Sequence, residues 1–252
     1  MTVIWGLNLR EMQWAKFKSS YMFGNRDYHL RRTKFGIYQG AMILTVVSES
    51  LGTAALSDYA AKQAFVAQHS PGTTVHNNTF VGIAAYNILV GIFVATVFGA
   101  AFFFDLFWPA RAESRAVKTA WRACSVCACL LTLSCVLVYT YIVATRSAYV
   151  TGTGAASAER QMAADGGSPL RYADNGRAVA SVVFLWPGMV FTFVSTWVLW
   201  RSLAHGDRFG PMSSHARKEE GAEKLPVGLD GAVEMLAQPP PTHAVPDADA
   251  RV

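Results

Sequence analysis

The chain has 252 residues, of which 52% are hydrophobic, 12% aromatic and only 15% charged. Soluble globular proteins carry nearer 25% charged residues, and collagen-like, disordered and disulfide-scaffold chains have other compositions again. The mean hydropathy of +0.24 is positive even though the polar C-terminal residues lower it. The composition therefore excludes these classes and indicates an integral membrane protein.

Residues 1–34 form a basic segment ahead of the first apolar stretch. Apolar side chains recur in it at helical spacing: Ile4, Trp5, Leu7, Leu9, Met12 and Trp14. Basic amphipathic helices lie on anionic leaflets by burying such a face, so one interpretation is an interfacial helix. The other is an irregular segment with scattered aromatic residues. The apolar start is too short for a signal peptide and lacks a basic n-region and a small-residue cleavage site.

Four apolar stretches are long enough to cross a membrane, at residues 35–56, 80–108, 120–144 and 178–200. A transmembrane helix needs roughly 20 mostly apolar residues to cross about 30 Å of hydrocarbon. The sequence thus predicts an all-α fold, a four-helix transmembrane bundle over residues 35–200. The two connections that follow the first and third spans are modest and polar, and neither has the composition of a folded ectodomain.

The distribution of Lys and Arg predicts the orientation, because these residues are retained on the cytoplasmic side during insertion. Seventeen of them lie in the N-terminal segment, the second connection and the C-terminal tail, against five in the other two connections. Both termini are therefore expected in the cytoplasm, in the plasma membrane or an endomembrane. Asn77 begins an Asn-Asn-Thr sequon on the expected outer side and is a candidate for glycosylation.

The net charge of +5 is explained by the same basic residues. Beside helix ends they attract an anionic cytoplasmic leaflet, at about 1 kcal/mol each. The expected partner is therefore the bilayer, and no nucleic acid is expected.

The most informative intramembrane residue is Glu49, since an acidic side chain in hydrocarbon costs a few kcal/mol and needs a partner or water. Thr45, Ser48 and Gly52 share its helix face. In the second span, a small-residue stripe with an amide at its outer end faces the first span: Asn87, Gly91, Ala95 and Gly99. An antiparallel register with a symmetric connection places Glu49 level with Asn87.

Two interpretations of this polar cluster remain open. In the first, a protonated Glu49 bonds to Asn87 and holds the helices together. In the second, Glu49 binds a cation or relays a proton. Asp105 lies near the cytoplasmic end of the second span, where an ion pair with Arg111 or Arg115 is expected.

Further intramembrane features point to packing. Gly36 and Gly40 form a small-xxx-small motif on the other side of the first span from Glu49, suited to lateral contact with a second copy or another membrane protein. Pro187 and Gly188 in the middle of the fourth span predict a kink.

All four cysteines lie in the third span, and Cys124 near its cytoplasmic end is a candidate for S-palmitoylation. Zinc needs four converging ligands, and Cys124 and Cys127 have no second pair to complete such a site. The six histidines are scattered outside the spans, and no phosphate loop or hydrolase motif occurs. The chain is therefore expected to be no enzyme and to need no metal or other cofactor.

Residues 201–252 are rich in proline and in charges of both signs and poor in aromatic residues. Such a composition does not bury enough apolar surface to offset the entropy of ordering, so a disordered cytoplasmic tail is expected.

In its layout of four spans between Phe35 and Trp200, internal termini and short outer connections, the chain resembles MARVEL-type and tetraspan cortical membrane proteins, including fungal plasma-membrane organisers. The outer connections lack the cysteines of claudin-like and cortical-patch tetraspans and of the large tetraspanin loop. The resemblance implies a non-enzymatic role in organising membrane patches or in trafficking. The alternative is a small transporter or channel subunit whose path is lined by Glu49 and Asn87.

Overall fold

The structure is a computed structural model, and it describes residues 3–4, 7–25, 27–69, 72–111, 113–152, 154, 156–157, 160 and 169–223. The chain divides into two compact units, Met1–Ser213 and Ser214–Val252. In the second unit, the described residues form helix α6, Ser214–Glu223.

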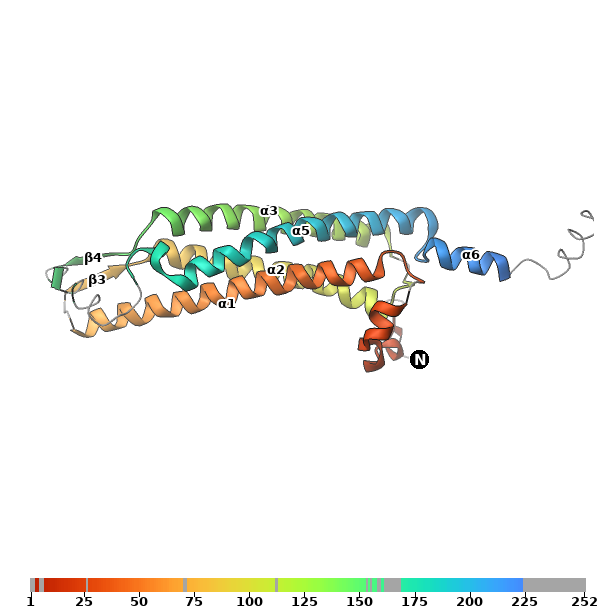
Figure 1. The fold of residues 1–252 in the computed structure, drawn as a ribbon, viewed down its shortest axis with the longest axis horizontal. Helices are drawn as coiled ribbons and strands as arrows, with labels where there is room; N and C mark the ends of the chain where they lie inside the picture. Colours follow the sequence, from red (N-terminus) through yellow and green to blue (C-terminus); the bar gives the residue numbers. More distant parts are fainter. Residues whose placement is uncertain are drawn as a thin grey trace, which may run out of the picture. The chain divides into compact units, whose positions relative to one another are not determined.

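The first unit is built around four long helices, α1 (Arg31–His69), α2 (Asn78–Phe107), α3 (Arg115–Thr145) and α5 (Gly176–Phe209). They run side by side, and each packs on two neighbours, in the cyclic order α1, α2, α3, α5 (Figure 1). All four are long and apolar enough to cross a membrane. The predicted all-α, four-helix transmembrane bundle is confirmed.

Helices α1, α3 and α5 extend beyond the predicted spans at both ends, and α2 begins two residues earlier and ends one residue earlier than predicted. The largest difference is in α1, which has 39 residues and continues to His69 instead of ending at residue 56. At 1.5 Å per residue it is about 58 Å long, well beyond the thickness of the hydrocarbon. Its last turns are polar on average, yet Tyr59, Lys62 and Val66 are buried at helical spacing against the rest of the bundle. The apolar stretch ends near residue 56, but the helix continues because these later residues are buried.

The C-terminal boundary also differs from the prediction. Helix α5 continues to Phe209, and Ser214–Glu223 is helical, so the non-helical tail does not begin at residue 201. The rest of the predicted disordered tail, residues 224–252, lies outside the described residues.

Two short strands link the connections at the end of the bundle where α1 ends. Strand β3 (Thr73–His76) pairs antiparallel with β4 (Tyr149–Gly152), with Val75 opposite Val150. The hydroxyls of Thr74 and Thr151 lie 3.0 Å apart across the pair. The two connections, neither of which has the composition of a folded ectodomain, are thus joined by a small two-stranded sheet.

The N-terminal segment is irregular, and this favours the second of its two interpretations. It contains a strand pair, β1 (Val3–Ile4) with β2 (Leu7–Asn8), two 3₁₀ turns (Leu9–Glu11 and Trp14–Phe17) and a π-helical turn (Ser20–Gly24).

The N-terminal segment is attached to the end of α2. The Lys16 ammonium donates to the carbonyl of Phe107 at 2.7 Å, and the Trp108 indole donates to the carbonyl of Asn8 at 2.9 Å. The ring of Phe17 lies edge-on to that of Phe107.

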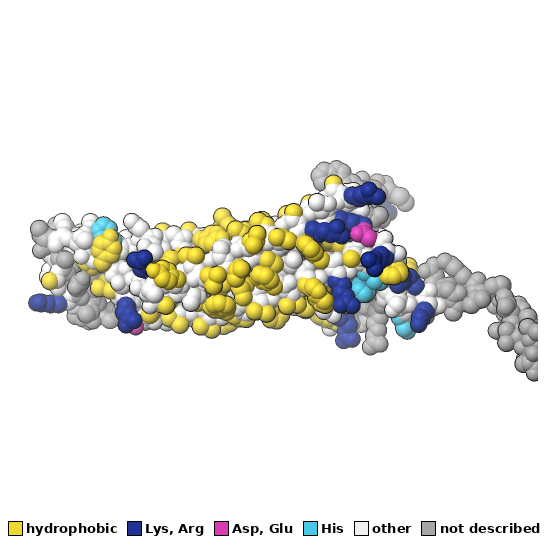
Figure 2. Space-filling model, turned by 90° about the horizontal axis from the view of Figure 1, so that it is seen from above, with side chains coloured by type: hydrophobic (Ala, Val, Ile, Leu, Met, Phe, Trp, Pro, Cys, Tyr) yellow, Lys and Arg dark blue, Asp and Glu magenta, His cyan; other side chains and the backbone are white. Residues whose placement is uncertain are grey.

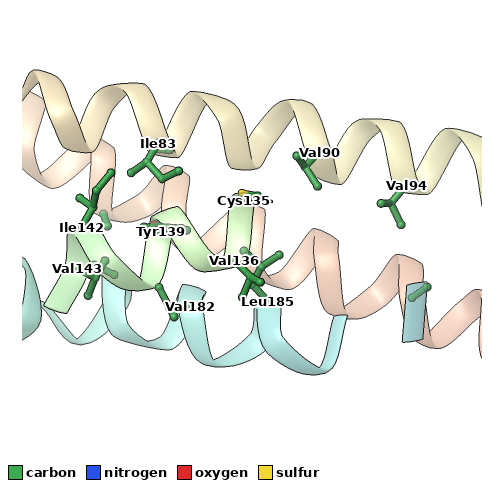
Figure 3. Packing of buried hydrophobic residues seen from close by; sticks show 14 of the residues in the cluster. Ile83, Val90, Val94, Cys135, Val136, Tyr139, Ile142, Val143, Val182 and Leu185 are labelled. Atoms are coloured by element: carbon green, nitrogen blue, oxygen red, sulfur yellow. The ribbon is translucent and has the colours of Figure 1, made fainter. Parts of the chain in front are cut away.

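The interior is filled by side chains from all four helices. Figure 3 shows Val90 of α2, Val136 of α3 and Leu185 of α5 among the residues buried inside the bundle. The outside is apolar as well. In Figure 2 hydrophobic side chains cover the middle of the visible face, and Lys and Arg gather toward one end. An apolar exterior of this kind suits contact with lipid.

Candidate functional site

A layer of polar side chains crosses the interior of the bundle, in the half nearer to the start of α5, and receives a contribution from every long helix. This polar layer consists of Ser48 and Gly52 of α1, Asn87 of α2, Cys135 and Tyr139 of α3, and Ser181 of α5. Its serine, asparagine, cysteine and tyrosine side chains are at most 1% exposed.

Hydrogen bonds connect the polar layer internally. The Asn87 amide donates from Nδ2 to Ser48 Oγ at 3.2 Å, and its Oδ1 accepts from the Cys135 thiol at 3.8 Å. The Ser181 hydroxyl donates to the Ser48 carbonyl at 2.7 Å. Because hydrocarbon offers no hydrogen-bonding partner, each such bond inside a membrane helps fix how neighbouring helices meet. The hydrogen bonds of the polar layer therefore hold the helices of this chain together.

Gly52 leaves the space that the polar layer needs. A Cβ atom at this position would lie 3.1 Å from the Tyr139 hydroxyl, 3.2 Å from Ser181 Oγ and 3.3 Å from Asn87 Nδ2. All three neighbours are polar groups held by the packing of other helices. The sequence placed Gly52 on the polar face of the first span, and the structure shows that it faces three helices at once.

Glu49 does not bond to Asn87, and the predicted register is wrong by about one helical turn. The Glu49 carboxylate lies directly against the position that a Cβ of Gly91 would occupy. Asn87 instead meets Ser48 and Gly52. The register was predicted from a symmetric connection, whereas α1 in fact extends to His69.

The Glu49 side chain is half-buried and lies beside Gly91, where α1 meets α2. No described residue forms a hydrogen bond or an ion pair with its carboxylate. On the outer faces of the same two helices, Val46 and Ile92 are 41% and 57% exposed. An acidic group therefore sits at the apolar, outward-facing side of the bundle.

Three further residues of the predicted small and polar faces, Thr45, Ala95 and Gly99, pack within the chain. Thr45 is buried, donates to the Ala41 carbonyl at 2.8 Å and contacts Gly188 of α5. Gly99 faces Met42 of α1, and Ala95 is half-buried.

The predicted Gly36 and Gly40 motif is divided between two environments. Gly40 lies tightly against the ring of Phe191 of α5, whereas Gly36 is exposed, with no heavy atom within 4 Å of its Cβ position. Of the two residues, Gly36 alone is open to a lateral partner.

Charged side chains are buried at the end of the bundle where α1 begins and α5 ends. Asp105 accepts from Lys34 at 2.7 Å and from Arg111 at 3.0 Å, and Arg111 also bonds to Glu113 at 2.6 Å. The expected pair between Asp105 and Arg111 is confirmed. Lys34 was not expected there, since no local pattern brings residue 34 beside residue 105.

The candidate modification sites differ in their accessibility. Asn77 is 2% exposed, and its Oδ1 accepts from Gln63 Nε2 at 2.8 Å, so a glycan on Asn77 requires this packing to open. Cys124 is half-buried and Cys127 is exposed. Among the described residues, no three His, Cys, Asp or Glu side chains converge in a way that could hold a metal ion.

No protein-family model, curated protein or solved structure matches the chain.

Proposed function

We propose that this protein is a non-enzymatic, MARVEL-like four-helix membrane protein that organises membrane patches or trafficking by packing laterally against a second copy or another membrane protein. In this proposal both termini lie in the cytoplasm of a cell whose plasma membrane or endomembrane it occupies. The excess of Lys and Arg on that side supports this orientation.

The observation that carries the proposal is the position of Glu49. A carboxyl group at membrane depth is costly unless it meets a polar partner. Within the described chain Asn87, the expected partner, bonds to Ser48 instead, and the Glu49 side chain lies half-buried beside Gly91. A neighbouring bundle that covers this side of α1 and α2 would supply a hydrogen bond to Glu49 and bury the exposed Val46 and Ile92.

The transport alternative required Glu49 and Asn87 to line one path. Asn87 instead faces inward, where the Cys135 thiol and the Ser48 hydroxyl occupy its hydrogen-bonding groups. The two residues therefore lie in different environments, since Asn87 is buried inside the bundle and Glu49 is half-buried beside Gly91. This arrangement favours lateral assembly over a shared path.

The test is the lateral mobility and stoichiometry of the protein, tagged at the C-terminus and expressed at its native level. Glu49→Leu removes the carboxyl and its hydrogen bonds, whereas Glu49→Gln keeps hydrogen-bonding capacity. We expect Glu49→Leu to diffuse faster and to bleach in fewer steps than the wild type, and Glu49→Gln to resemble the wild type.

Ser50→Ala provides the matched control, because Ser50 is an exposed neighbour whose hydroxyl already bonds to the Val46 carbonyl at 2.8 Å. We expect it to behave as the wild type. Uniform, fast diffusion of the wild type would contradict the proposal. Equal loss of a transport activity in Glu49→Gln and Glu49→Leu, with mobility unchanged, would favour the alternative.

A further inference from the structure

A cavity of about 340 Å³ opens at the end of the bundle where α1 begins. It is lined by the N-terminal segment and by all four long helices or the residues that adjoin them. Its ionised lining consists of Arg31, Lys34, Asp105, Arg111, Glu113 and Lys118. We call this cavity the basic mouth.

Positive charge exceeds negative charge in the basic mouth. Four cationic side chains line it against two carboxylates, and both carboxylates already form ion pairs with Lys34 or Arg111. Lys118 pairs with Asp207, which it shares with Arg122. Adding Arg122 and Asp207 to the count leaves the same excess of two positive charges. A site of this composition attracts anions.

Of the four lining cations, Arg31 is the one that forms no ion pair with a described carboxylate. It is 2% exposed, and none of its Nε, Nη1 and Nη2 atoms forms a hydrogen bond with a described residue. The rings of Tyr21, Tyr28 and Phe35 lie 4.7 to 5.5 Å from its guanidinium carbon. Ring contacts hold a guanidinium in place but leave its N–H groups without an acceptor. A buried cation with unsatisfied donors is costly, so an acceptor in the cavity would stabilise it.

The position of the cations at the start of α1 is a second reason to expect an anion in the cavity. Arg31, Arg32 and Lys34 lie in the first turn of α1, which contains no acidic residue. The start of a helix carries partial positive charge, which favours anions and disfavours cations. An anion between the helix start and these side chains would reduce the repulsion among the cations and the repulsion between the cations and the helix start.

We propose that the basic mouth is a binding site for a phosphate group, with Arg31 as its central ligand and Lys34 and Lys118 as supporting cations. Phosphate presents several oxygens to the planar fork of an arginine and to nearby ammonium groups. The mouth lies where the apolar helices end, at the level of lipid headgroups. The same chemistry fits a phosphorylated lipid headgroup or soluble phosphate, and the experiment separates these two sources.

The experiment uses the full chain in phosphatidylcholine nanodiscs. It is titrated by calorimetry with inorganic phosphate and, separately, with short-chain phosphatidylinositol 4-phosphate. We expect saturable binding to at least one of them. Binding of the lipid alone identifies a headgroup site, and comparable binding of both identifies a site open to soluble phosphate.

Arg31→Gln tests the central ligand, and Arg32→Gln is its matched control. Arg32 is exposed, lies next in the chain and does not line the cavity, so its replacement removes the same charge from the same turn. Loss of charge-assisted hydrogen bonds predicts affinity at least about tenfold weaker in Arg31→Gln. We expect less than about a twofold change in Arg32→Gln.

Three results would overturn the proposal. They are no saturable binding to either probe by the wild type, an equal loss in the two variants, or no loss in Arg31→Gln. If Arg31→Gln does not yield a monodisperse, helical protein, Lys118→Gln replaces it, because the Lys118 side chain is 25% exposed and its partner Asp207 keeps Arg122. We then expect a loss of about threefold or more, and a value equal to that of Arg32→Gln would refute the site.

Discussion

The polar layer and the basic mouth are both buried and polar, but they differ in charge. In the layer, neutral groups such as Asn87 and Ser48 satisfy one another. In the mouth, ionised groups such as Lys34 and Asp105 pair, and cations remain in excess. The comparison teaches that neutral groups can satisfy one another inside a helical bundle, whereas ionised groups of unequal number leave a charge that another ion can compensate.

The largest effect that separates the two regions is expected from Asp105→Asn. The substitution removes the charge that compensates Lys34 at 2.7 Å, in a pair whose side chains are 10% and 14% exposed. Removing one partner of a buried pair costs about 3–5 kcal/mol. We expect a loss of about 3 kcal/mol, since Glu113 still pairs with Arg111. The free energy of unfolding in mixed micelles measures it.

Asp58→Asn is the control for this prediction. Asp58 pairs with Arg177 at 2.7 Å at the opposite end of the bundle, but the two side chains are 30% and 57% exposed. Exposed pairs contribute about 0–1 kcal/mol. If both substitutions cost the same, the charged groups of the mouth are not buried in the protein as it exists in micelles.

A smaller effect is expected in the polar layer from Gly52→Ala. The added methyl group would lie within 3.3 Å of polar groups on three helices, which must move apart by a few tenths of an ångström. Overpacking of this kind costs about 1–3 kcal/mol. Gly82→Ala on α2 is the matched change, because its Cβ position has no heavy atom within 4 Å, and there alanine is expected to stabilise the helix by up to about 1 kcal/mol. Opposite signs in unfolding experiments support a tight layer, and equal signs contradict it.

The smallest effect on stability at neutral pH is expected from a change at Tyr172, at the end of the bundle opposite the basic mouth. Tyr172 is buried and neutral, in contrast to the charged groups of the mouth. Burial, reinforced by the nearby Tyr59, raises the pKa of Tyr172 to about 12. An unfolded tyrosine ionises near pH 10. The folded state therefore keeps the Tyr172 proton longer, and its contribution to stability is complete below pH 10 and is lost as the pH rises through about 12.

Tyr172→Phe removes the ionisable hydroxyl and with it the loss of stability between pH 10 and 12. Below pH 9 we expect its free energy of unfolding to lie within about 1 kcal/mol of the wild type. Between pH 10 and 12 the wild type should lose stability more steeply than the variant. Parallel curves over this range would show that Tyr172 is accessible to water.

The sequence predicted those features that depend on runs of residues. Four apolar stretches required four helices, because a backbone in lipid must satisfy its own hydrogen bonds. The ion pair of Asp105 with Arg111 was also predictable, since both residues flank one helix end. The continuation of α1 to His69 was missed, although Tyr59, Lys62 and Val66 follow a helical pattern that hydropathy alone does not detect.

The features that were missed depend on contacts between distant residues. Glu49 was assigned to Asn87 from an assumed symmetric connection, and an error of one turn was enough to change its neighbour to Gly91. Lys34 and Arg31 were interpreted as topology signals, which is how isolated basic residues beside a span are read. Only the assembled bundle shows that they line one cavity with Arg111.

The pairing of β3 with β4 has a consequence for how the protein is made. Thr74 and Thr151 face each other across this pair but are 77 residues apart in the chain. When β3 leaves the ribosome, α2, α3 and β4 have not yet been made, so β3 has no strand to pair with. The pairing forms only once α3 and β4 follow it. Closure of this end of the bundle is therefore a late step in the synthesis of the protein.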